Sequence, residues 1–182
     1  YAGNKKVIDF LIEGGLDGIL VLGSAGEFPD LNEQERLDFF RFYAEYVNGR
    51  VELLAGTGCI RYADTLALSN AVYELGYTPM VISPYYFEMD QEKLFVYYDR
   101  LAKDVKGDLY LYNFPPRTGH SIAPETIRRL IDANPNIIGL KDSVSTPGHT
   151  NMVCRAVDGK PFTVYSGFDD QFLSNIANNG GG

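Results

Sequence analysis

The stretch NIIGLKDS, residues 136–143, is branched and aliphatic up to a single lysine, Lys141. A short apolar run bounded by polar residues is typical of a buried strand. Successive side chains of a strand point to opposite faces. This alternation predicts two faces, with Ile138, Leu140 and Asp142 on one and Gly139, Lys141 and Ser143 on the other. Lys141 is therefore expected at the end of a buried strand, on the face with the smallest side chains.

The expected surroundings of Lys141 bear on its chemistry. An amine among apolar groups loses hydration of its charged form, so its pKa falls and a neutral, nucleophilic fraction exists near neutral pH. Such an amine can form a Schiff base with a carbonyl substrate. The alternative is a strand-end lysine that reaches solvent, because most lysines in proteins are exposed. This stretch alone leaves both interpretations open.

Strands and helices alternate on both sides of this stretch. Six apolar runs are predicted to be strands: GILVLGS (18–24), VELLAGT (51–57), MVIS (80–83), DLYLYNF (108–114), IIGLK (137–141) and FTVYSG (162–167). Helices are predicted at 3–15, 31–47, 62–75, 91–105 and 124–133, the second with Asn32 as N-cap and Glu35 in a capping box. The alternation predicts parallel βαβ units in a sheet that is buried on both faces.

The carboxyl ends of the six predicted strands carry glycine and polar residues. These ends read GSAGE, GTG, SPYYF, YNFPPRTG, KDS and SGFDD. An open doubly wound sheet gathers its ligand contacts at one switch point, whereas a barrel brings all strand ends to one mouth. The sequence therefore favours an α/β fold of the (β/α)8 TIM-barrel type. With six strands and about seven helices, the barrel is expected to be incomplete, lacking its first and last strands, within a single domain over 1–182.

Composition excludes several classes of partner. The chain has 182 residues, of which 45% are hydrophobic and 22% charged, and its net charge is −8. We expect no nucleic-acid or membrane partner, because such surfaces need a basic face or a long apolar run. Cys59 and Cys154 lie far apart in the sequence, which favours a reducing, cytoplasmic location. No metal-ligand spacing is present, so no metal is expected.

Two strand ends carry distinctive motifs. In GSAGEF (23–28) the glycines permit a tight turn whose backbone amides can surround a carboxylate or phosphate, although an ordinary βα turn is the alternative. In YNFPPRTG (112–119), Tyr112 ends a strand whose alternation also points Tyr110 inward. The Tyr112 phenol can transfer protons at the barrel mouth, and Arg117 can pair with a carboxylate. A core tyrosine and a solvated arginine are the alternatives.

Taken together, GSAGE, GTG, PYYF, YNFPPRTG, GLKDS and SGFDD resemble, in this order, the dihydrodipicolinate synthase and N-acetylneuraminate lyase family of class I, pyruvate-dependent aldolases. The resemblance covers essentially the whole chain. YNxPxRTG followed by GLKD at this distance is specific to that family. It implies a (β/α)8 barrel, commonly a homotetramer, whose substrates are pyruvate and an aldehyde and which uses no cofactor.

The resemblance also implies roles for single residues. Lys141 matches the Schiff-base lysine and Tyr112 the proton-shuttling tyrosine. Ser24 matches the hydroxyl residue that links this tyrosine to the site, and the amides of Ser24 and Ala25 are expected to hold the pyruvate carboxylate. Tyr86 matches an aromatic residue that some relatives insert across a subunit interface. Arg117 matches the arginine by which the synthases position an acidic aldehyde.

Two departures from the synthase pattern bear on the substrate. Ala25 replaces the second hydroxyl residue of GTTGE, which removes one contact to the carboxylate. In SGFDD, an aromatic residue separates glycine and aspartate as in sugar-acid lyases; the segment supplies Gly167, Phe168, Asp169 and Asp170 as expected substrate contacts. The predicted activity is a lyase or aldolase reaction on a 2-keto-3-deoxy sugar acid. The alternatives are dihydrodipicolinate synthase, which Arg117 favours, and a catalytically silent barrel that binds keto acids.

Overall fold

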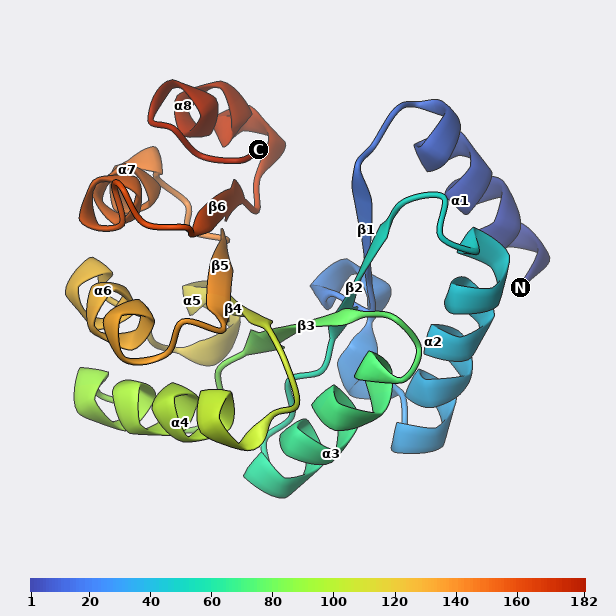
Figure 1. The fold of residues 1–182 in the computed structure, drawn as a ribbon, viewed down its shortest axis with the longest axis horizontal. Coiled ribbons are helices and arrows are strands. Elements are labelled where there is room, and N and C mark those ends of the chain that lie inside the picture. The colour runs from blue at the N-terminus through green and yellow to red at the C-terminus, as the bar shows by residue number, and fades with distance from the viewer.

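The computed structural model describes residues 1–182, and it contains one sheet of six parallel strands in the order β1-β2-β3-β4-β5-β6 (Figure 1). The strands are β1 (Gly18–Val21), β2 (Glu52–Gly56), β3 (Thr78–Ile82), β4 (Leu109–Asn113), β5 (Ile137–Asp142) and β6 (Thr163–Ser166). Each of the six coincides with a predicted strand. Every neighbouring pair is parallel, as expected for βαβ units.

The helices surround this curled sheet (Figure 1). They are α1 (Ala2–Glu13), α2 (Glu33–Val47), α3 (Tyr62–Tyr73), α4 (Gln91–Asp104), α5 (Pro115–Thr118), α6 (Pro124–Ala133), α7 (Pro147–Ala156) and α8 (Phe172–Ala177), with short 3-10 turns η1 (Ser24–Gly26), η2 (Phe28–Asp30) and η3 (Asp169–Gln171). Strands inside and helices outside make this an incomplete (β/α)8 barrel, which confirms the predicted fold class. None of the helices is both long and apolar enough to cross a membrane.

The five predicted helices are confirmed, and local signals explain their ends. The side chain of Asn32 accepts a hydrogen bond from the Glu35 amide while the Glu35 carboxylate accepts one from the Asn32 amide, which completes the capping box of α2. The α5, α7 and α8 helices were not predicted individually. The start of α7 had a readable signal, since Pro147 occupies a first-turn position after Thr146.

The core consists of two apolar clusters. One fills the space between β3–β6 and the helices α4, α6 and α7, and the other covers β1–β3, α2 and α3 and includes residues inside the barrel. Alternation along β4 follows the prediction: Leu109 and Leu111 belong to the cluster under the helices, whereas Tyr110 and Tyr112 belong to the other. The β4 strand therefore presents its two tyrosines to the barrel interior.

The face predicted for Ile138 is wrong. Leu140 packs under the helices as part of the first cluster, but Ile138 packs against the cluster that contains Tyr110. The physical reason is a shift of register between β4 and β5, where Leu109 pairs with Ile137 but Tyr110 pairs with Gly139. An extra residue in one strand reverses the alternation at that point. From Gly139 onward the predicted alternation holds.

The sheet has two edges, β1 and β6, because its order does not close into a ring. Two glycines lie along the β6 edge: the Gly181 amide donates to the Val164 carbonyl at 2.9 Å, and the Ser166 amide donates to the Gly182 carbonyl at 2.6 Å. These contacts show that this edge accepts a further extended segment. The chain contributes one sheet with one set of surrounding helices, and its description as a single domain stays a prediction.

Candidate active site

One layer of side chains crosses the barrel interior near the carboxyl ends of the strands. Ile82, Tyr112, Lys141 and Tyr165 are successive register partners on β3, β4, β5 and β6. The amine nitrogen of Lys141 lies 4.9 Å from the centroid of the Tyr112 ring. Lys141 is half-buried, and burial lowers its pKa below the ordinary lysine value. The layer thus holds an amine with a raised neutral fraction beside a phenol.

The next layer explains why a glycine precedes Leu140 on β5. A Cβ atom at Gly139 would lie 2.3 Å from the Tyr110 ring and 2.6 Å from the Thr163 carbonyl. No side chain fits in that space. Gly139 therefore makes room for the Tyr110 ring, which also contacts Tyr165 at a centroid distance of 5.9 Å. The Tyr110 ring therefore lies in the layer next to that of Lys141 and contacts Tyr165, the register partner of Lys141.

Ser24 connects the loop after β1 to this layer. Its hydroxyl oxygen lies 3.2 Å from the Tyr112 hydroxyl oxygen, and Tyr112 is only 3% exposed. The loop is held in an unusual conformation, since Leu22 and Glu27 have φ angles of 56° and 54°. Left-handed backbone at residues other than glycine costs free energy and is concentrated at functional sites. The Leu22 carbonyl oxygen also lies close to Gly56. A Cβ atom at Gly56 would be only 2.0 Å from this oxygen, so no larger residue fits there.

Two hollows are lined by residues that lie next to Tyr112: Lys141 lines one and Ser24 the other. The inner one, of about 460 Å³, is lined by Lys141 together with Leu20, Leu54, Met80, Tyr165 and residues near the open side of the barrel. The second, of about 340 Å³, lies toward the mouth and is lined by Ser24, Phe28, Pro29, Ile82, Tyr85 and Arg117. The sequence indicated Ser24 and Arg117 for this region. It did not indicate Phe28, Ile82 or Tyr85, whose motifs read equally well as packing residues.

The ring of Phe114 joins Arg117 and Phe168 to the site. It stacks on Tyr112 with a centroid distance of 5.8 Å, meets Phe168 edge to face at 6.4 Å, and has the Arg117 guanidinium 5.9 Å above it. These contacts bring YNFPPRTG and SGFDD together at the mouth. Phe114 was not predicted as a site residue, although it lies between two residues of a recognised motif.

Ala25, Gly167, Asp169 and Asp170, the next predicted site residues, line neither hollow. Ala25 is exposed in η1. Gly167 packs against Ser143, where a Cβ atom would lie 1.9 Å from the serine hydroxyl oxygen. Asp169 and Asp170 are exposed in η3 and line neither hollow. The SGFDD segment therefore contacts the site through Phe168, while its two carboxylates face solvent.

Tyr86 and Tyr85 have different surroundings although they are neighbours. Tyr86 is 83% exposed, has a φ angle of 85° and contacts only the ring of the exposed Phe87 among the aromatic residues. Tyr85 instead lies against Phe28 and lines the mouth hollow, and burial raises its pKa. Within one chain, the site therefore contains Tyr85 rather than Tyr86.

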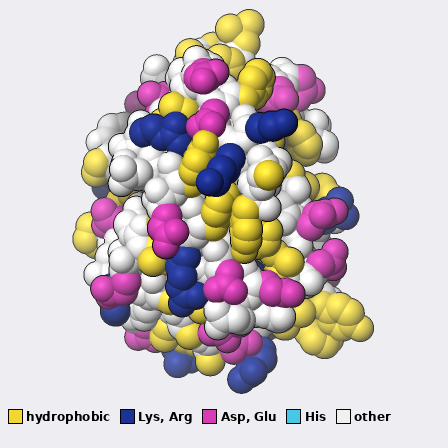
Figure 2. All heavy atoms as spheres, turned by 90° about the vertical axis from the view of Figure 1, so that its right-hand side faces the viewer, with side chains coloured by type: hydrophobic (Ala, Val, Ile, Leu, Met, Phe, Trp, Pro, Cys, Tyr) yellow, Lys and Arg dark blue, Asp and Glu magenta, His cyan; other side chains and the backbone are white.

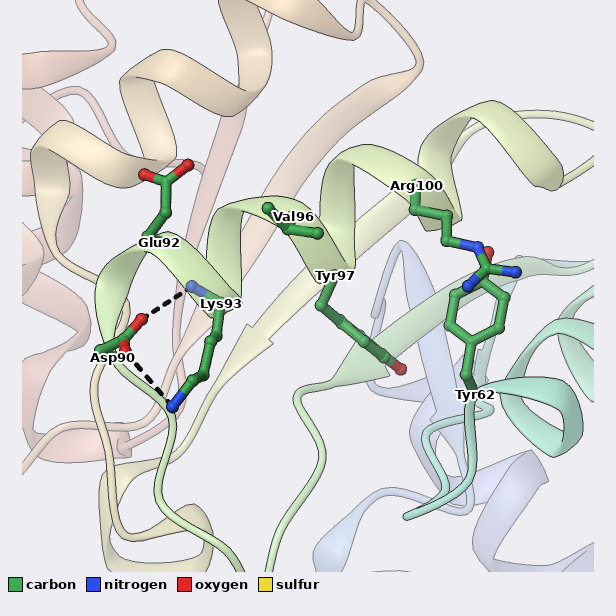
Figure 3. A pocket seen from close by; sticks show the side chains of 7 residues that line it. All are labelled: Tyr62, Asp90, Glu92, Lys93, Val96, Tyr97 and Arg100. Carbon is green, nitrogen blue, oxygen red and sulfur yellow. Dashed lines mark hydrogen bonds and ion pairs between the residues drawn. The ribbon is translucent and has the colours of Figure 1, made fainter.

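A third hollow lies elsewhere. Its volume is about 480 Å³, and it is lined by Tyr62 on α3 and by α4 side chains that include Val96, Tyr97 and Arg100 (Figure 3). The guanidinium of Arg100 lies over the Tyr62 ring at 4.3 Å, and Asp90 and Lys93 pair with each other at its rim. None of the predicted site residues lines it. It is a surface groove on the outside of the barrel, away from the strand ends.

A sequence model of the dihydrodipicolinate synthetase family matches residues 2–182 of this chain. The chain belongs to this family. The match covers all six strands and every element that carries the site, in agreement with the resemblance inferred from the motifs. No group of three or more histidine, cysteine, aspartate or glutamate side chains lies together in a way that could hold a metal ion.

Relatives with two different activities in their names are similar to this chain. A putative 2-dehydro-3-deoxy-D-gluconate aldolase, YagE, from Escherichia coli is 36% identical over 99% of this chain and 61% of its own length. A probable 2-dehydro-3-deoxy-D-pentonate aldolase from the same organism is 35% identical over 98% and 60%. A 4-hydroxy-tetrahydrodipicolinate synthase from Kosmotoga olearia is 35% identical over 100% and 63%. The chain thus spans about three fifths of the length of these relatives.

Solved structures agree with the fold. The crystal structure of YagE in complex with pyruvate has a TM-score of 0.95 at 36% identity, over 100% of this chain and 62% of that one. The 2-keto 3-deoxygluconate aldolase from Picrophilus torridus has a TM-score of 0.93 at 27% identity, over 100% and 65%. Both structural similarities include the strands that carry Tyr112 and Lys141.

Proposed function

We propose that this protein is a class I lyase or aldolase that cleaves or forms a carbon–carbon bond between pyruvate and an aldehyde through a Schiff base on Lys141. The observation that carries the proposal is the half-buried amine of Lys141, which lies over the Tyr112 ring inside the barrel with its pKa lowered by burial. A neutral amine beside a buried phenol is what imine chemistry requires.

In the cleavage direction the Lys141 amine attacks the C2 carbonyl of the substrate, and loss of water gives an iminium. Tyr112 gives its phenol proton to the departing water and becomes a phenolate. The electrons of the C3–C4 bond then flow into the iminium and form an enamine, while the Tyr112 phenolate takes the C4 hydroxyl proton and the aldehyde leaves. The contact between Tyr112 and Ser24 gives this proton a route out of the barrel. Protonation of the enamine at C3 and hydrolysis release pyruvate and restore the amine. The iminium is the electron sink, so the reaction needs no cofactor.

The carboxylate of pyruvate is assigned to the turn that contains Ser24 and Ala25. The hydrogen bonds of this turn use the amides of Gly26 and Glu27, which donate to Gly23 and Ser24. The first amides of a helical turn have no partner within it. The Ser24 and Ala25 amides are therefore available to a carboxylate that approaches from the side of Tyr112.

We assign the aldehyde part of the substrate to the mouth hollow and its chemical class to the 2-keto-3-deoxy sugar acids. Arg117 lines this hollow and can bind either hydroxyls or an acid group. Phe168 contacts the ring of Phe114, over which the Arg117 guanidinium lies. Two relatives of this chain are named as aldolases of such sugar acids, which supports this class. We expect Asp169 and Asp170 to contact substrate hydroxyls only if η3 moves toward the mouth.

The second candidate function is 4-hydroxy-tetrahydrodipicolinate synthase, which condenses pyruvate with aspartate semialdehyde. Arg117 favours it, because a guanidinium pairs well with the carboxylate of that aldehyde. Similar proteins named as this synthase, such as the one from Kosmotoga olearia, also favour it. A third candidate, a catalytically silent keto-acid-binding barrel, would bind pyruvate without turnover.

We further propose that the working protein is a homo-oligomer, a dimer or tetramer, located in the cytoplasm. Tyr86 supports the first part, since an aromatic side chain that is 83% exposed next to the exposed Phe87 forms a projecting apolar pair. A second copy of the chain is the partner that the family resemblance implies for this pair. Sedimentation of the intact protein and of Tyr86→Ala tests this assignment.

Borohydride reduction in the presence of pyruvate tests the function directly. Reduction of the imine should leave one stable adduct on Lys141, identified by peptide mass spectrometry. Lys141→Ala should give no adduct, whereas Lys160→Ala, which removes an exposed lysine paired with Asp132, should label like the wild type. An adduct on another lysine, or none on the folded intact protein, would falsify the proposal. An adduct without turnover of any aldehyde would support the third candidate, the catalytically silent barrel that binds keto acids.

A further inference from the structure

Directly behind the reactive pair, on the helix-facing side of the sheet, four residues form a closed ring of hydrogen bonds. Asn113 Nδ2 donates to Asp142 Oδ1 at 2.7 Å, and the Ile122 amide donates to Asn113 Oδ1 at 3.0 Å. His149 closes the ring, with Nδ1 2.9 Å from Asp142 Oδ2 and Nε2 3.0 Å from the Ile122 carbonyl oxygen. The ring therefore joins β4, β5, the segment before α6, and α7.

The nearest partners of His149 favour its protonated form. A carboxylate and a carbonyl oxygen can only accept hydrogen bonds, so Nδ1 and Nε2 donate to both at once only as the imidazolium. The Ser121 hydroxyl, 3.4 Å from Nε2, is a longer alternative partner for that nitrogen. Asp142 is fully buried and Asn113 is 1% exposed. His149 is the one cation paired with Asp142. If His149 lost its second proton, one of the four hydrogen bonds would be lost and the buried Asp142 carboxylate would have no counter-charge.

The charges around His149 agree with this assignment. Burial by itself lowers the pKa of His149. The opposing effects are larger and raise this pKa above the ordinary value: they come from the hydrogen bond and charge of Asp142, the Ile122 carbonyl and the charge of Glu125 on α6. Thr150 donates a further hydrogen bond to Asp142 at 2.7 Å. Cys154, the other titratable group of α7 near this carboxylate, has its pKa raised, first by burial and then by the Asp142 charge.

The ring lies one residue beyond the reactive pair in both strands. Tyr112 pairs with Lys141 in the register of β4 and β5, and the next pair is Asn113 with Asp142. Side chains of consecutive residues point to opposite faces, so the ring and the reactive pair are two sides of one strand junction. A displacement of about 1 Å at a reacting group can cost roughly a hundredfold in rate. A constraint at this junction therefore acts on the spacing of the phenol and the amine.

We propose that His149 is a positioning residue: its imidazolium closes this ring and thereby holds Lys141 and Tyr112 in the geometry for imine formation and proton transfer. This inference rests on the proposed function. His149 acts through Asp142 and the β4–β5 junction and touches no substrate. The other histidine, His120, serves as an internal comparison, because it accepts from the Met89 amide through Nδ1 and lies 2.8 Å from the Ser83 hydroxyl through Nε2.

The protonation states are tested by nitrogen NMR on histidine-labelled intact protein, with the signals of His149 and His120 assigned from variants that lack one or the other. His149 should show two protonated nitrogens at neutral pH, whereas His120 should be neutral with its proton on Nε2. Asp142→Asn should return His149 to the neutral form near pH 7. A neutral His149 in the wild type would overturn the proposal without reference to catalysis.

The positioning role is tested by the rate of imine formation with pyruvate in His149→Gln, normalised to the folded fraction. The rate should fall about tenfold or more, with pyruvate affinity changed less than about twofold. Thr150→Val is the matched control, because it removes a hydrogen bond of the same carboxylate but leaves the ring closed. It should lower the melting temperature and leave the rate within about twofold of the wild type.

Chemical rescue gives a second readout. In His149→Ala, added imidazole should restore the rate at about pH 6, where it is a cation, and much less at about pH 8.5, where it is neutral. If Thr150→Val slowed imine formation equally, or if rescue did not depend on pH, His149 would be a packing residue and not a positioning residue. A wild type that forms no imine with pyruvate would instead overturn the proposed function while leaving the NMR result valid.

Discussion

Lys141 and Tyr112 are register partners on adjacent strands, and the lysine nitrogen lies 4.9 Å from the centre of the tyrosine ring. The hydroxyl of the same tyrosine contacts Ser24 at 3.2 Å, at the end of another strand. One buried phenol thus connects the amine at the inner hollow with the loop at the barrel mouth. This arrangement places imine formation and proton transfer at different atoms of one site.

Tyr112→Phe should keep imine formation measurable but slow carbon–carbon bond cleavage. The ring that packs under Lys141 and on Phe114 remains, while the hydroxyl that moves the proton is lost. A positioned acid–base group contributes roughly a hundredfold or more. Single-turnover kinetics separate the two steps. Unchanged cleavage would mean that the proton leaves by another route.

The rate of imine formation should rise with pH, with its midpoint below the value of about 10.4 of a free lysine. Burial lowers the pKa of Lys141, so the amine becomes neutral and nucleophilic at a lower pH than an exposed lysine does. Below that pKa the charged amine is unreactive. Borohydride trapping across pH measures the midpoint. A midpoint at or above the free lysine value would contradict the burial of this amine.

Gly139→Ala should destabilise the protein by about 1–3 kcal/mol, the usual cost of forcing extra atoms into a packed core. The new methyl group would lie 2.3 Å from the Tyr110 ring and 2.6 Å from a backbone carbonyl. Gly148→Ala in α7 is the control, since its methyl group meets nothing within 4 Å and alanine favours a helix. Denaturant unfolding compares the two. Equal stabilities would show that Tyr110 can move aside.

Release of pyruvate from a 2-keto-3-deoxy sugar acid should exceed condensation with aspartate semialdehyde by at least about tenfold in kcat/KM, a difference of roughly 1.4 kcal/mol at the transition state. The mouth hollow combines Arg117 with aromatic and hydroxyl groups, which suits a polyol chain. Direct competition on the intact protein measures the ratio. If aspartate semialdehyde is preferred, Arg117 is the specificity residue and the synthase assignment replaces this one.

Residues 1–182 expressed alone should aggregate or melt without cooperativity. The outer edges of β1 and β6 pair with no other strand of the sheet, and an inner hollow of about 460 Å³ opens between them. Outside, α1 exposes Val7 and Phe10, and apolar side chains lie among charged ones on the face that carries α1 and α2 (Figure 2). Size-exclusion chromatography and calorimetry test this. A sharp melt of a monomer would show that these edges need no partner.

The sequence by itself determined the strand order and the chemistry of the strand ends. Period-two alternation in β4 predicted that Tyr110 and Tyr112 face inward, whereas the apolar run before Lys141 left a buried and an exposed amine both open until the family motifs were considered. The alternation is a local pattern, because a strand must place its side chains on alternate faces. The capping box of Asn32 and Glu35 was readable for the same reason, since its partners are three residues apart.

The tertiary structure decided what depends on contacts between distant segments. The register shift at Ile138 arises between β4 and β5, and no pattern within either strand encodes it. The choice of Tyr85 over Tyr86 at the mouth depends on packing against Phe28, and the exposure of Asp169 depends on where η3 turns. The imidazolium of His149 follows from three other segments that meet only in the folded chain, because hydrogen-bond partners, unlike alternation, are set by position in space.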